Sequence, residues 1–411
     1  MKKKLFAAAA ALLCLCSCVF HFRPSVRAAS PGIRFAGAAE GEAAAARYCT
    51  VEAAAPVEAD AKAYLLMNAE TGAVLAAKNE RVRLYPASVT KIMTLLLTVE
   101  AVEAGTLKKE DVLVCSETAA AKGGSQIWLA PGEKMTVDDL LKAAFVYSAN
   151  DACTLLAETV AGSESAFVGR MNEKAKALGM TDTLFDNCTG LDDNTTEHLT
   201  TAYDVALMSR ALLSHDGVSD YTTIWMDTLR GGETQLVNTN RLIRTYPGAV
   251  GLKTGTTSKA GCCVSAAAKR DGMTLIAVVL GAPDSKTRFA AAVSLLDHGF
   301  ANYELFVPPA PEPASLRTVP VRFGQIGEVG LTFTPGKPLL LDKGAGRNVT
   351  TRVEIDEETT APVEAGASLG EISYWAGAKK LAACPLTAAY GVERLTVKSA
   401  AERLLRAASA A

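Results

Sequence analysis

Hydrophobic positions along the 411-residue chain follow two patterns, one typical of strands and one typical of helices. Short apolar runs bounded by turn residues predict strands at residues 64–68, 73–76, 251–257, 263–268 and 273–280. The turn between the first two lies at residues 68–72, and Asp271-Gly272 forms a tight turn between the last two. Each of these two pairs is therefore predicted to be an antiparallel hairpin.

Longer apolar stretches predict helices between and after these strands. The run from Ile92 to Val102 ends at Gly105 and predicts a buried helix of about four turns, with Ser88 in its first turn. Further helices are predicted at residues 136–146, 152–160, 167–178, 201–213 and 285–299. Together these elements predict a domain of the α/β (α+β) class over residues 61–306.

The remaining segments predict how the chain is divided. Residues 29–60 are rich in Ala, Glu and Gly without periodicity, which predicts a flexible leader. A proline-rich stretch at 307–315 predicts a semi-rigid linker. Short apolar runs with frequent Gly and Pro predict a small all-β domain at 316–392, followed by a C-terminal segment at 393–411.

Residues 1–28 have the pattern of a signal peptide. Lysines at positions 2–4 precede an apolar stretch from Leu5 to Phe20, and Val26-Arg27-Ala28 is a suitable cleavage site. Cys18 lies in a poor lipoprotein signal, so its lipidation stays open. The mature protein is predicted to be exported to the cell envelope, either on the outer face of the cytoplasmic membrane or secreted.

Composition argues against several kinds of function. The chain is 49% hydrophobic and 21% charged with a net charge of −2, so no nucleic-acid partner is expected. Three of the ten cysteines lie in the signal peptide, and the scattered remainder predict small buried residues rather than a disulfide scaffold. The histidines show no metal-ligand spacing, so neither a metal nor another cofactor is predicted.

The first candidate for chemistry is the pair Ser88 and Lys91. Residues three apart share one helix face, so a hydroxyl and an amine lie together at the start of a buried helix. Burial lowers the pKa of a lysine, and the neutral amine can then take the serine proton. Taken alone, the same pattern also fits a helix cap beside a lysine that reaches toward solvent.

Two further motifs favour the catalytic interpretation. Ser148-x-Asn150 falls between two predicted helices, and Lys253-Thr254-Gly255 falls on a predicted strand. Each motif alone is common in loops and turns. Their joint presence in an exported chain, at a helix start, an interhelical loop and a strand edge, indicates a single site for acyl transfer.

The three motifs with their flanking residues resemble the serine-type D-Ala-D-Ala carboxypeptidases, the low-molecular-mass penicillin-binding proteins. The resemblance covers about residues 61–392, and Ala149 stands where family members often carry Gly. It implies a β-lactamase/transpeptidase-like domain, with an antiparallel sheet flanked by helices, followed by a small all-β domain. It also implies removal of the terminal D-Ala from peptidoglycan stem pentapeptides and acylation by penicillin and other β-lactam antibiotics.

The resemblance assigns the chemical steps to four polar residues. Ser88 attacks the carbonyl between the two D-alanines and forms an acyl-enzyme, with Lys91 as the base. Ser148 relays a proton to the leaving amine. Asn150 holds Lys91 and the substrate amide.

The third motif is expected to bind the substrate. Lys253 supplies a positive charge for the terminal carboxylate, and the hydroxyls of Thr254 and Thr256 assist it. Gly255 lies between them on the strand. The resemblance places the oxyanion hole at the backbone N–H groups of Ser88 and Thr256.

Three other functions stay open at this stage. A class A β-lactamase needs a deacylating glutamate in a Glu-x-x-Leu-Asn segment between the second and third motifs, and the sequence contains none there. A transpeptidase would pass the acyl group to an amine instead of water. A catalytically silent envelope-binding module would give no covalent adduct with penicillin.

The C-terminal segment predicts an amphipathic helix. Its apolar face consists of Val397, Ala400, Ala401, Leu404, Leu405 and Ala408. Basic residues outside this face are Arg394, Lys398, Arg403 and Arg406. Such a helix favours weak, salt-sensitive contact with an anionic membrane surface, although it could also pack on the protein or fray.

Overall fold

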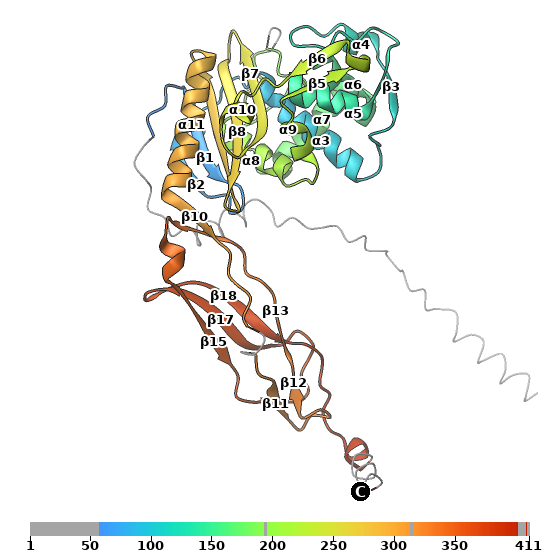
Figure 1. Cartoon of the computed structure of the whole chain (residues 1–411). Helices are drawn as coiled ribbons and strands as arrows, with labels where there is room; N and C mark the ends of the chain where they lie inside the picture. Colours follow the sequence, from blue (N-terminus) through green and yellow to red (C-terminus); the bar gives the residue numbers. More distant parts are fainter. Residues whose placement is uncertain (1–56, 193–194, 313–315, 402–407, 409–411) are drawn as a thin grey trace, which may run out of the picture. The chain divides into compact units, whose positions relative to one another are not determined.

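The computed structural model describes residues 57–192, 195–312, 316–401 and 408. Its centre is an antiparallel sheet with the strand order β2-β1-β9-β8-β7 (Figure 1). The strands are β1 (Ala63–Asn68), β2 (Val74–Lys78), β7 (Ala249–Thr257), β8 (Gly261–Arg270) and β9 (Met273–Ala282). The two predicted hairpins therefore lie side by side in one sheet, because β1 pairs with β9. The predicted signal peptide and most of the predicted leader lie outside the described residues.

Strand β9 shows why the sequence places this sheet in the middle of the domain. Its side chains alternate between two hydrophobic clusters, with Leu275 and Val279 in one and Ile276 and Val278 in the other. A strand that is buried on both faces is apolar throughout rather than alternately polar. The sheet is thus packed on both faces.

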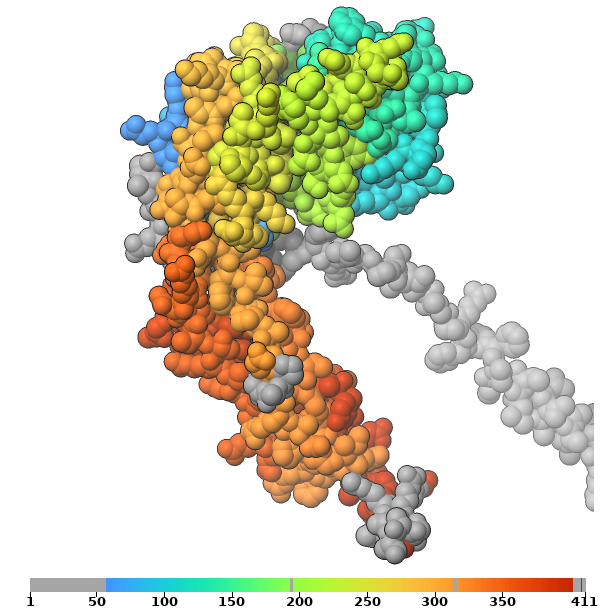
Figure 2. Space-filling model, in the orientation of Figure 1, coloured from blue at the N-terminus to red at the C-terminus, as the bar shows by residue number. Residues whose placement is uncertain are grey.

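Helix α11 (Ser285–Asn302) covers one face of the sheet, and a larger group of helices covers the other (Figure 1). The longer helices of this group are α3 (Lys91–Glu103), α5 (Val137–Lys142), α6 (Asn150–Ala161), α7 (Glu164–Ala177) and α8 (Ala202–Leu213). Its shorter helices are α4 (Glu117–Ala120), α9 (Val218–Thr222) and α10 (Leu242–Thr245). Two small hairpins, β3 (Val112–Val114) with β4 (Lys134–Thr136) and β5 (Met226–Leu229) with β6 (Thr234–Val237), complete it. In the space-filling view the helical region, cyan to lime, continues into the yellow and orange surface of the sheet and α11 (Figure 2).

Helix boundaries follow local capping signals with one departure from the prediction. The Thr136 and Thr201 hydroxyls each accept a hydrogen bond from the backbone N–H three residues on, and so begin α5 and α8. The helix predicted over 136–146 is not α-helical throughout, because residues Ala143–Tyr147 form a π-helical turn. This turn ends at Ser148, whose φ of 68° is left-handed. Such turns are frequent at functional sites.

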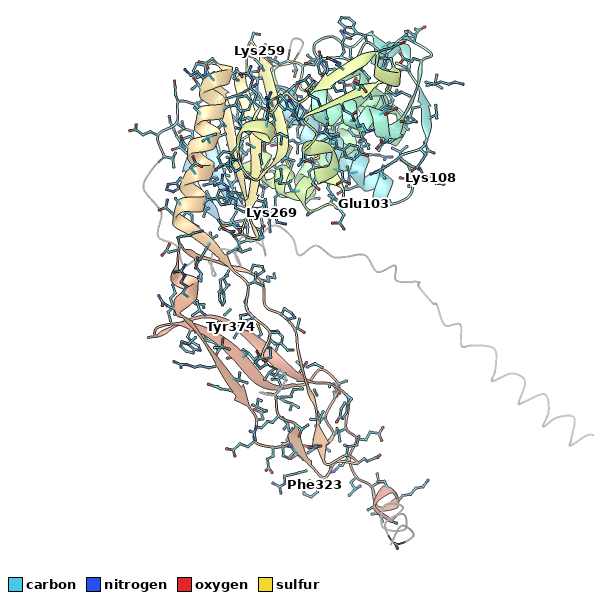
Figure 3. The ribbon with its side chains drawn as sticks, in the orientation of Figure 1. Glu103, Lys108, Lys259, Lys269, Phe323 and Tyr374 are labelled. Atoms are coloured by element: carbon cyan, nitrogen blue, oxygen red, sulfur yellow. The ribbon has the colours of Figure 1, made fainter. Side chains whose placement is uncertain are left out.

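The C-terminal region is built from strands, as predicted. The main sheet has the order β13-β18-β17-β15, with β13 (Leu331–Phe333), β15 (Val349–Ile355), β17 (Ser368–Ala376) and β18 (Lys379–Ala388). A smaller sheet contains β11 (Val319–Arg322), β12 (Glu328–Val329) and β16 (Thr359–Thr360), and β14 (Leu339–Asp342) pairs with β10 (Tyr303–Phe306). Tyr374, labelled in Figure 3, is buried and donates to the Pro309 carbonyl at 2.7 Å.

The predicted amphipathic helix is described only at its beginning. Residues 397–401 are helical, and Val397 is 90% exposed. Leu404 and Leu405, the two leucines of the predicted apolar face, lie outside the described residues. Over the residues that the structure describes, no helix is both long and apolar enough to cross a membrane.

Candidate active site

Ser88 lies in a 3-10 turn, Ala87–Thr90, that leads directly into α3. The prediction had placed it in the first turn of the α-helix itself. The Lys91 ammonium donates to Ser88 Oγ at 2.8 Å and to the Thr189 carbonyl at 2.7 Å. Lys91 is fully buried, and burial lowers its pKa to about 8. Hydroxyl and amine therefore meet as the spacing predicted.

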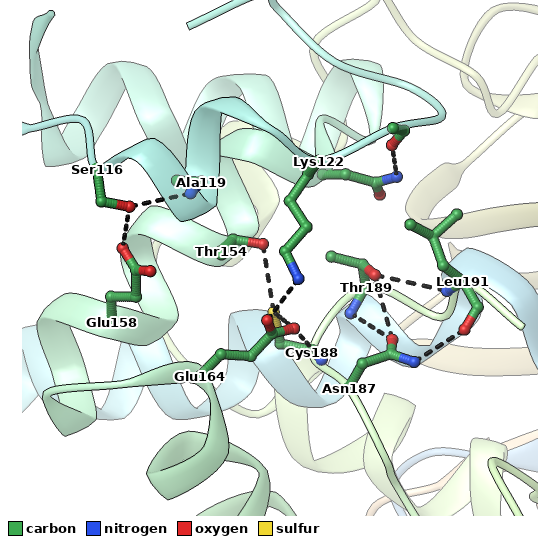
Figure 4. Close-up of polar contacts among 12 residues, drawn as sticks. Ser116, Ala119, Lys122, Thr154, Glu158, Glu164, Asn187, Cys188, Thr189 and Leu191 are labelled. Atoms are coloured by element: carbon green, nitrogen blue, oxygen red, sulfur yellow. Dashed lines mark hydrogen bonds and ion pairs between the residues drawn. The ribbon is translucent and has the colours of Figure 1, made fainter. Parts of the chain in front are cut away.

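A tight turn at residues 187–191 supplies the second partner of Lys91. Asn187 Oδ1 accepts the backbone N–H of Thr189 at 3.1 Å (Figure 4). It also accepts the backbone N–H of Gly190 at 2.7 Å. Gly190 has a φ of 86°, and a Cβ there would lie 1.9 Å from the Ala87 carbonyl oxygen. Only glycine permits this approach. The turn is consequently fixed against the Ser88 segment.

The second motif lies at the start of α6. Ser148 Oγ is buried without a hydrogen-bond partner among the described residues, and so is Asn150 Oδ1. The Asn150 side-chain nitrogen donates to the Gly123 carbonyl at 2.6 Å, and its backbone N–H donates to the Ser125 carbonyl at 2.7 Å. The Asn150 amide nitrogen is thus bonded to the loop at 123–125. Ser148 Oγ and Asn150 Oδ1 are thus the polar atoms of this motif that remain unpartnered in the described structure.

The third motif runs along β7, against the Ser88 turn. A Cβ at Gly255 would lie 2.7 Å from Ser88 N, so only glycine lets the strand approach this closely. Lys253 is buried, and burial, followed by the nearby positive charge of Lys91, holds its pKa well below the usual value. Its Nζ donates to the Thr254 carbonyl at 3.3 Å. The Thr254 hydroxyl donates to Thr239 Oγ1 at 2.8 Å.

Three buried residues that sequence reasoning did not single out support these motifs. The first is Arg288 on α11, whose Nη1 donates to Thr256 Oγ1 at 3.0 Å and to the Gly255 carbonyl at 3.0 Å. Burial lowers the pKa of its guanidinium. Arg288 sits next to the third motif although it is distant from it in sequence, so no local pattern could have identified it.

The second is Asp151, immediately after the second motif. Its fully buried carboxylate accepts the backbone N–H groups of Leu129 at 3.0 Å, Ala152 at 2.9 Å and Ile127 at 3.1 Å. These bonds fix the loop that carries the exposed Trp128. The sequence offered one sign of this role: Asp151 stands next to apolar residues, and a buried carboxylate needs hydrogen-bond donors.

The third is His198, which is fully buried beside the Ser88 turn. Its Nδ1 accepts the Asp186 backbone N–H at 3.0 Å, so Nε2 carries the proton and donates to Thr90 Oγ1 at 2.7 Å. Burial lowers its pKa to about 4, which keeps the ring neutral near pH 7. His198 therefore fixes Thr90, the residue before Lys91.

Among the described residues, the cysteines are buried and free, and they form no metal-ligand cluster with the histidines. Within the described part of the chain, no group of three or more His, Cys, Asp or Glu side chains is placed to hold a metal ion. Six cysteines, Cys115, Cys153, Cys188, Cys262, Cys263 and Cys384, are free and buried, as their scattered positions predicted. Burial raises the pKa of Cys153 and of Cys263 to about 11. They behave as small apolar residues rather than as thiolates.

Fold and site together define a penicillin-binding serine hydrolase with a β-lactamase/transpeptidase-like catalytic domain. The family model for D-alanyl-D-alanine carboxypeptidase matches residues 50–284, and that for the penicillin-binding protein 5 C-terminal domain matches residues 310–394. The chain belongs to the D-alanyl-D-alanine carboxypeptidase family. It is a serine-type carboxypeptidase, which confirms the predicted family, activity and fold class.

Named relatives agree over most of the chain. It is 41% identical to D-alanyl-D-alanine carboxypeptidase DacF of Bacillus subtilis, over 80% of this chain and 85% of that protein. It is 36% identical to DacC of Escherichia coli, over 81% of this chain and 84% of that protein. Penicillin-binding protein 5 of Haemophilus influenzae superposes with a TM-score of 0.70 at 29% identity, covering 83% of this chain and all of that one. The ampicillin-bound penicillin-binding protein D2 of Listeria monocytogenes superposes with a TM-score of 0.55 at 32% identity, covering 59% of this chain and 99% of that one.

Proposed function

We propose that Ser88 is the acylated nucleophile of this carboxypeptidase and Lys91 its base. The observation that supports this assignment most directly is the 2.8 Å hydrogen bond between Lys91 Nζ and Ser88 Oγ. The pKa of this lysine is lowered to about 8. The neutral amine takes the Oγ proton while Oγ attacks the carbonyl carbon between the two D-alanines. The carbon–nitrogen bond then breaks, and D-alanine leaves after its nitrogen receives a proton.

Ser148 and Asn150 are proposed to serve the leaving group and the substrate amide. Buried polar atoms are normally hydrogen-bonded, so the unpartnered Ser148 Oγ and Asn150 Oδ1 need an explanation. A substrate peptide supplies it: Ser148 relays the proton to the departing nitrogen, and Asn150 Oδ1 accepts the peptide N–H. Water then attacks the Ser88 ester and releases the shortened peptide.

The third motif is proposed to bind the substrate carboxylate. Burial lowers the pKa of Lys253, and a bound carboxylate opposes this by favouring the ammonium form, which then supplies the positive charge. The Thr254 and Thr256 hydroxyls, which donate to Thr239 and to the Gly255 carbonyl here, are proposed to turn toward the carboxylate. The developing oxyanion is assigned to the backbone N–H groups of Ser88 and Thr256. The close approach of Gly255 to Ser88 supports this assignment, because it keeps β7 against the 3-10 turn that contains Ser88.

The substrate is proposed to be the peptidoglycan stem pentapeptide, with β-lactam antibiotics as acylating analogues. Support comes from the family, and from the ampicillin-bound state of the structural relative from Listeria monocytogenes. We further propose export by residues 1–28, a leader at 29–60, a catalytic domain at 61–306, a linker at 307–315 and a β domain at 316–392. The tail at 393–411 is proposed to make weak contact with an anionic membrane surface in the cell envelope.

Release of D-alanine from a diacyl-L-Lys-D-Ala-D-Ala peptide tests this function. Release in water, without an added acceptor amine, is the expected result. Release that requires an acceptor amine would instead favour transpeptidation. Liposome co-sedimentation of the protein with and without residues 393–411 tests the membrane contact. Equal binding of both forms to anionic vesicles at low salt would contradict this proposal.

A further inference from the structure

Three side chains outside the three motifs, Lys122, Glu164 and Cys188, form a chain of polar contacts (Figure 4). Lys122, which follows α4, forms an ion pair of 2.5 Å with Glu164 in the first turn of α7. The other oxygen of Glu164 accepts the Cys188 backbone N–H at 3.3 Å and the Cys188 thiol at 3.2 Å. One carboxylate thus joins two segments that are far apart in sequence.

Both ends of this chain continue into the site. On one side, Lys122 precedes Gly123, whose carbonyl accepts the Asn150 side chain at 2.6 Å. On the other side, Cys188 precedes Thr189, whose carbonyl accepts Lys91 Nζ at 2.7 Å. The ion pair therefore ties together the two backbone segments that hold Asn150 and Lys91.

The protonation states of Glu164 and Cys188 are consistent with these contacts. Burial raises the pKa of Glu164, but hydrogen bonds from Lys122 and Cys188 outweigh it and leave the pKa below the usual value. Burial, followed by the Glu164 charge, holds the pKa of the Cys188 thiol well above its usual value. Near neutral pH the carboxylate accepts from an ammonium, a thiol and an amide. A charged acceptor makes such bonds stronger than neutral ones.

We propose that Lys122, Glu164 and Cys188 form a positioning clamp that sets the distance between the Gly123 and Thr189 carbonyls. These are positioning residues, because they act through Asn150 and Lys91 and not on the substrate. The clamp rests on the proposed roles of those two residues. Its loss slows the chemical step more than it weakens binding, because small displacements of reacting groups cost rate.

The chain offers a matched control on the same helix. Lys174 of α7 pairs with Glu100 of α3, and the side-chain exposures of this pair, 24% and 30%, are close to the 23% and 18% of Lys122 and Glu164. Neither Lys174 nor Glu100 is bonded through its side chain to the segments at 123–125 or 187–191 in the described contacts. Glu100→Gln removes a similar ion pair without touching the proposed clamp.

Benzylpenicillin acylation of the full mature protein provides the test. The saturating acylation rate constant and the penicillin dissociation constant are measured separately for wild type, Glu164→Ala, Glu164→Gln, Lys122→Met, Lys122→Arg and Glu100→Gln, each well below its Tm. Glu164→Ala is expected to slow acylation about 10- to 30-fold with little change in the dissociation constant. Glu164→Gln and Lys122→Met should show smaller losses, and Lys122→Arg should restore most of the rate because the ion pair persists.

Two outcomes would overturn the clamp while leaving the proposed function intact. One is acylation at the wild-type rate in both Glu164→Gln and Lys122→Met. These two variants keep the test decisive even if Glu164→Ala fails to fold. The other is an equal slowing in Glu100→Gln, which would indicate a general loss of stability. Failure of wild-type protein to form any adduct would contradict the proposed function instead.

Discussion

The catalytic region and the C-terminal β region differ in how far they bury polar and charged side chains. The former buries Lys91, Lys253, Asp151 and His198 almost completely, and each has hydrogen-bond partners. Among the described residues from 316 onward, no charged side chain is buried, and the buried hydroxyls belong to Ser373 and Tyr374. There the charges form exposed pairs such as Arg322 with Glu358.

This difference indicates where function lies. Burying a charged group costs free energy unless partners compensate, so a protein retains such groups where chemistry needs them. Exposed ion pairs contribute little to stability. Substitutions should therefore affect acylation strongly at the buried lysines and hardly at all in the β region.

The largest effect is expected for Lys91→Ala. The proposed base acts in the transition state, and its removal should slow penicillin acylation about a thousandfold or more. Stopped-flow or quenched acylation kinetics measure this directly. Acylation at the wild-type rate would remove Lys91 as the base.

Lys253→Ala should come next, through substrate capture. Without this ammonium the substrate carboxylate is buried without a partner, which costs about 2–5 kcal/mol. The loss should appear mainly in KM for the D-Ala-D-Ala peptide. A loss confined to the acylation rate constant, with unchanged KM, would contradict a role in binding the carboxylate.

Lowering the pH by one unit below the pKa of Lys91 should have a smaller effect on acylation than either substitution. Only neutral Lys91 can accept the serine proton, and the pKa of Lys91 is lowered to about 8. The rate should therefore fall about tenfold for each pH unit below that value and level off above it. A rate that stays constant between pH 6 and 8 would mean that Lys91 does not titrate in this step.

The smallest effect is expected for Arg322→Ala in the β region. Its partner Glu358 is more than half exposed, so solvent already screens the pair. Acylation should change less than about twofold, and Tm should move by no more than a degree or two. A larger change in acylation would show that the two regions are coupled.

Sequence patterns predicted the secondary structure correctly where the hydrophobic positions followed a single clear pattern. The apolar runs of the two hairpins placed β1, β2, β8 and β9 correctly. β1, β8 and β9 are buried along most of their length, and strands covered on both faces leave continuous apolar runs, whereas the edge strand β2 is only partly buried. The π-helical turn before Ser148 was not predicted, since its residues are as apolar as those of a regular helix. A change of helix type leaves no sign in hydrophobic periodicity.

The site was predictable only where its residues stand in short motifs. Ser88 and Lys91 are three residues apart, so helical geometry alone brings them together. Arg288 and the turn at 187–191 reach the site through tertiary packing, and no local spacing encodes that. The contact between Gly255 and Ser88 likewise becomes visible only once the strand is placed.

Intact mass after incubation with benzylpenicillin, followed by peptide mapping, tests the central proposal most directly. Wild type should gain one penicilloyl group on the peptide that contains Ser88, and Ser88→Ala should gain none. A full adduct on Ser88→Ala, or an adduct mapped to another peptide in wild type, would contradict the assignment of Ser88 as the nucleophile.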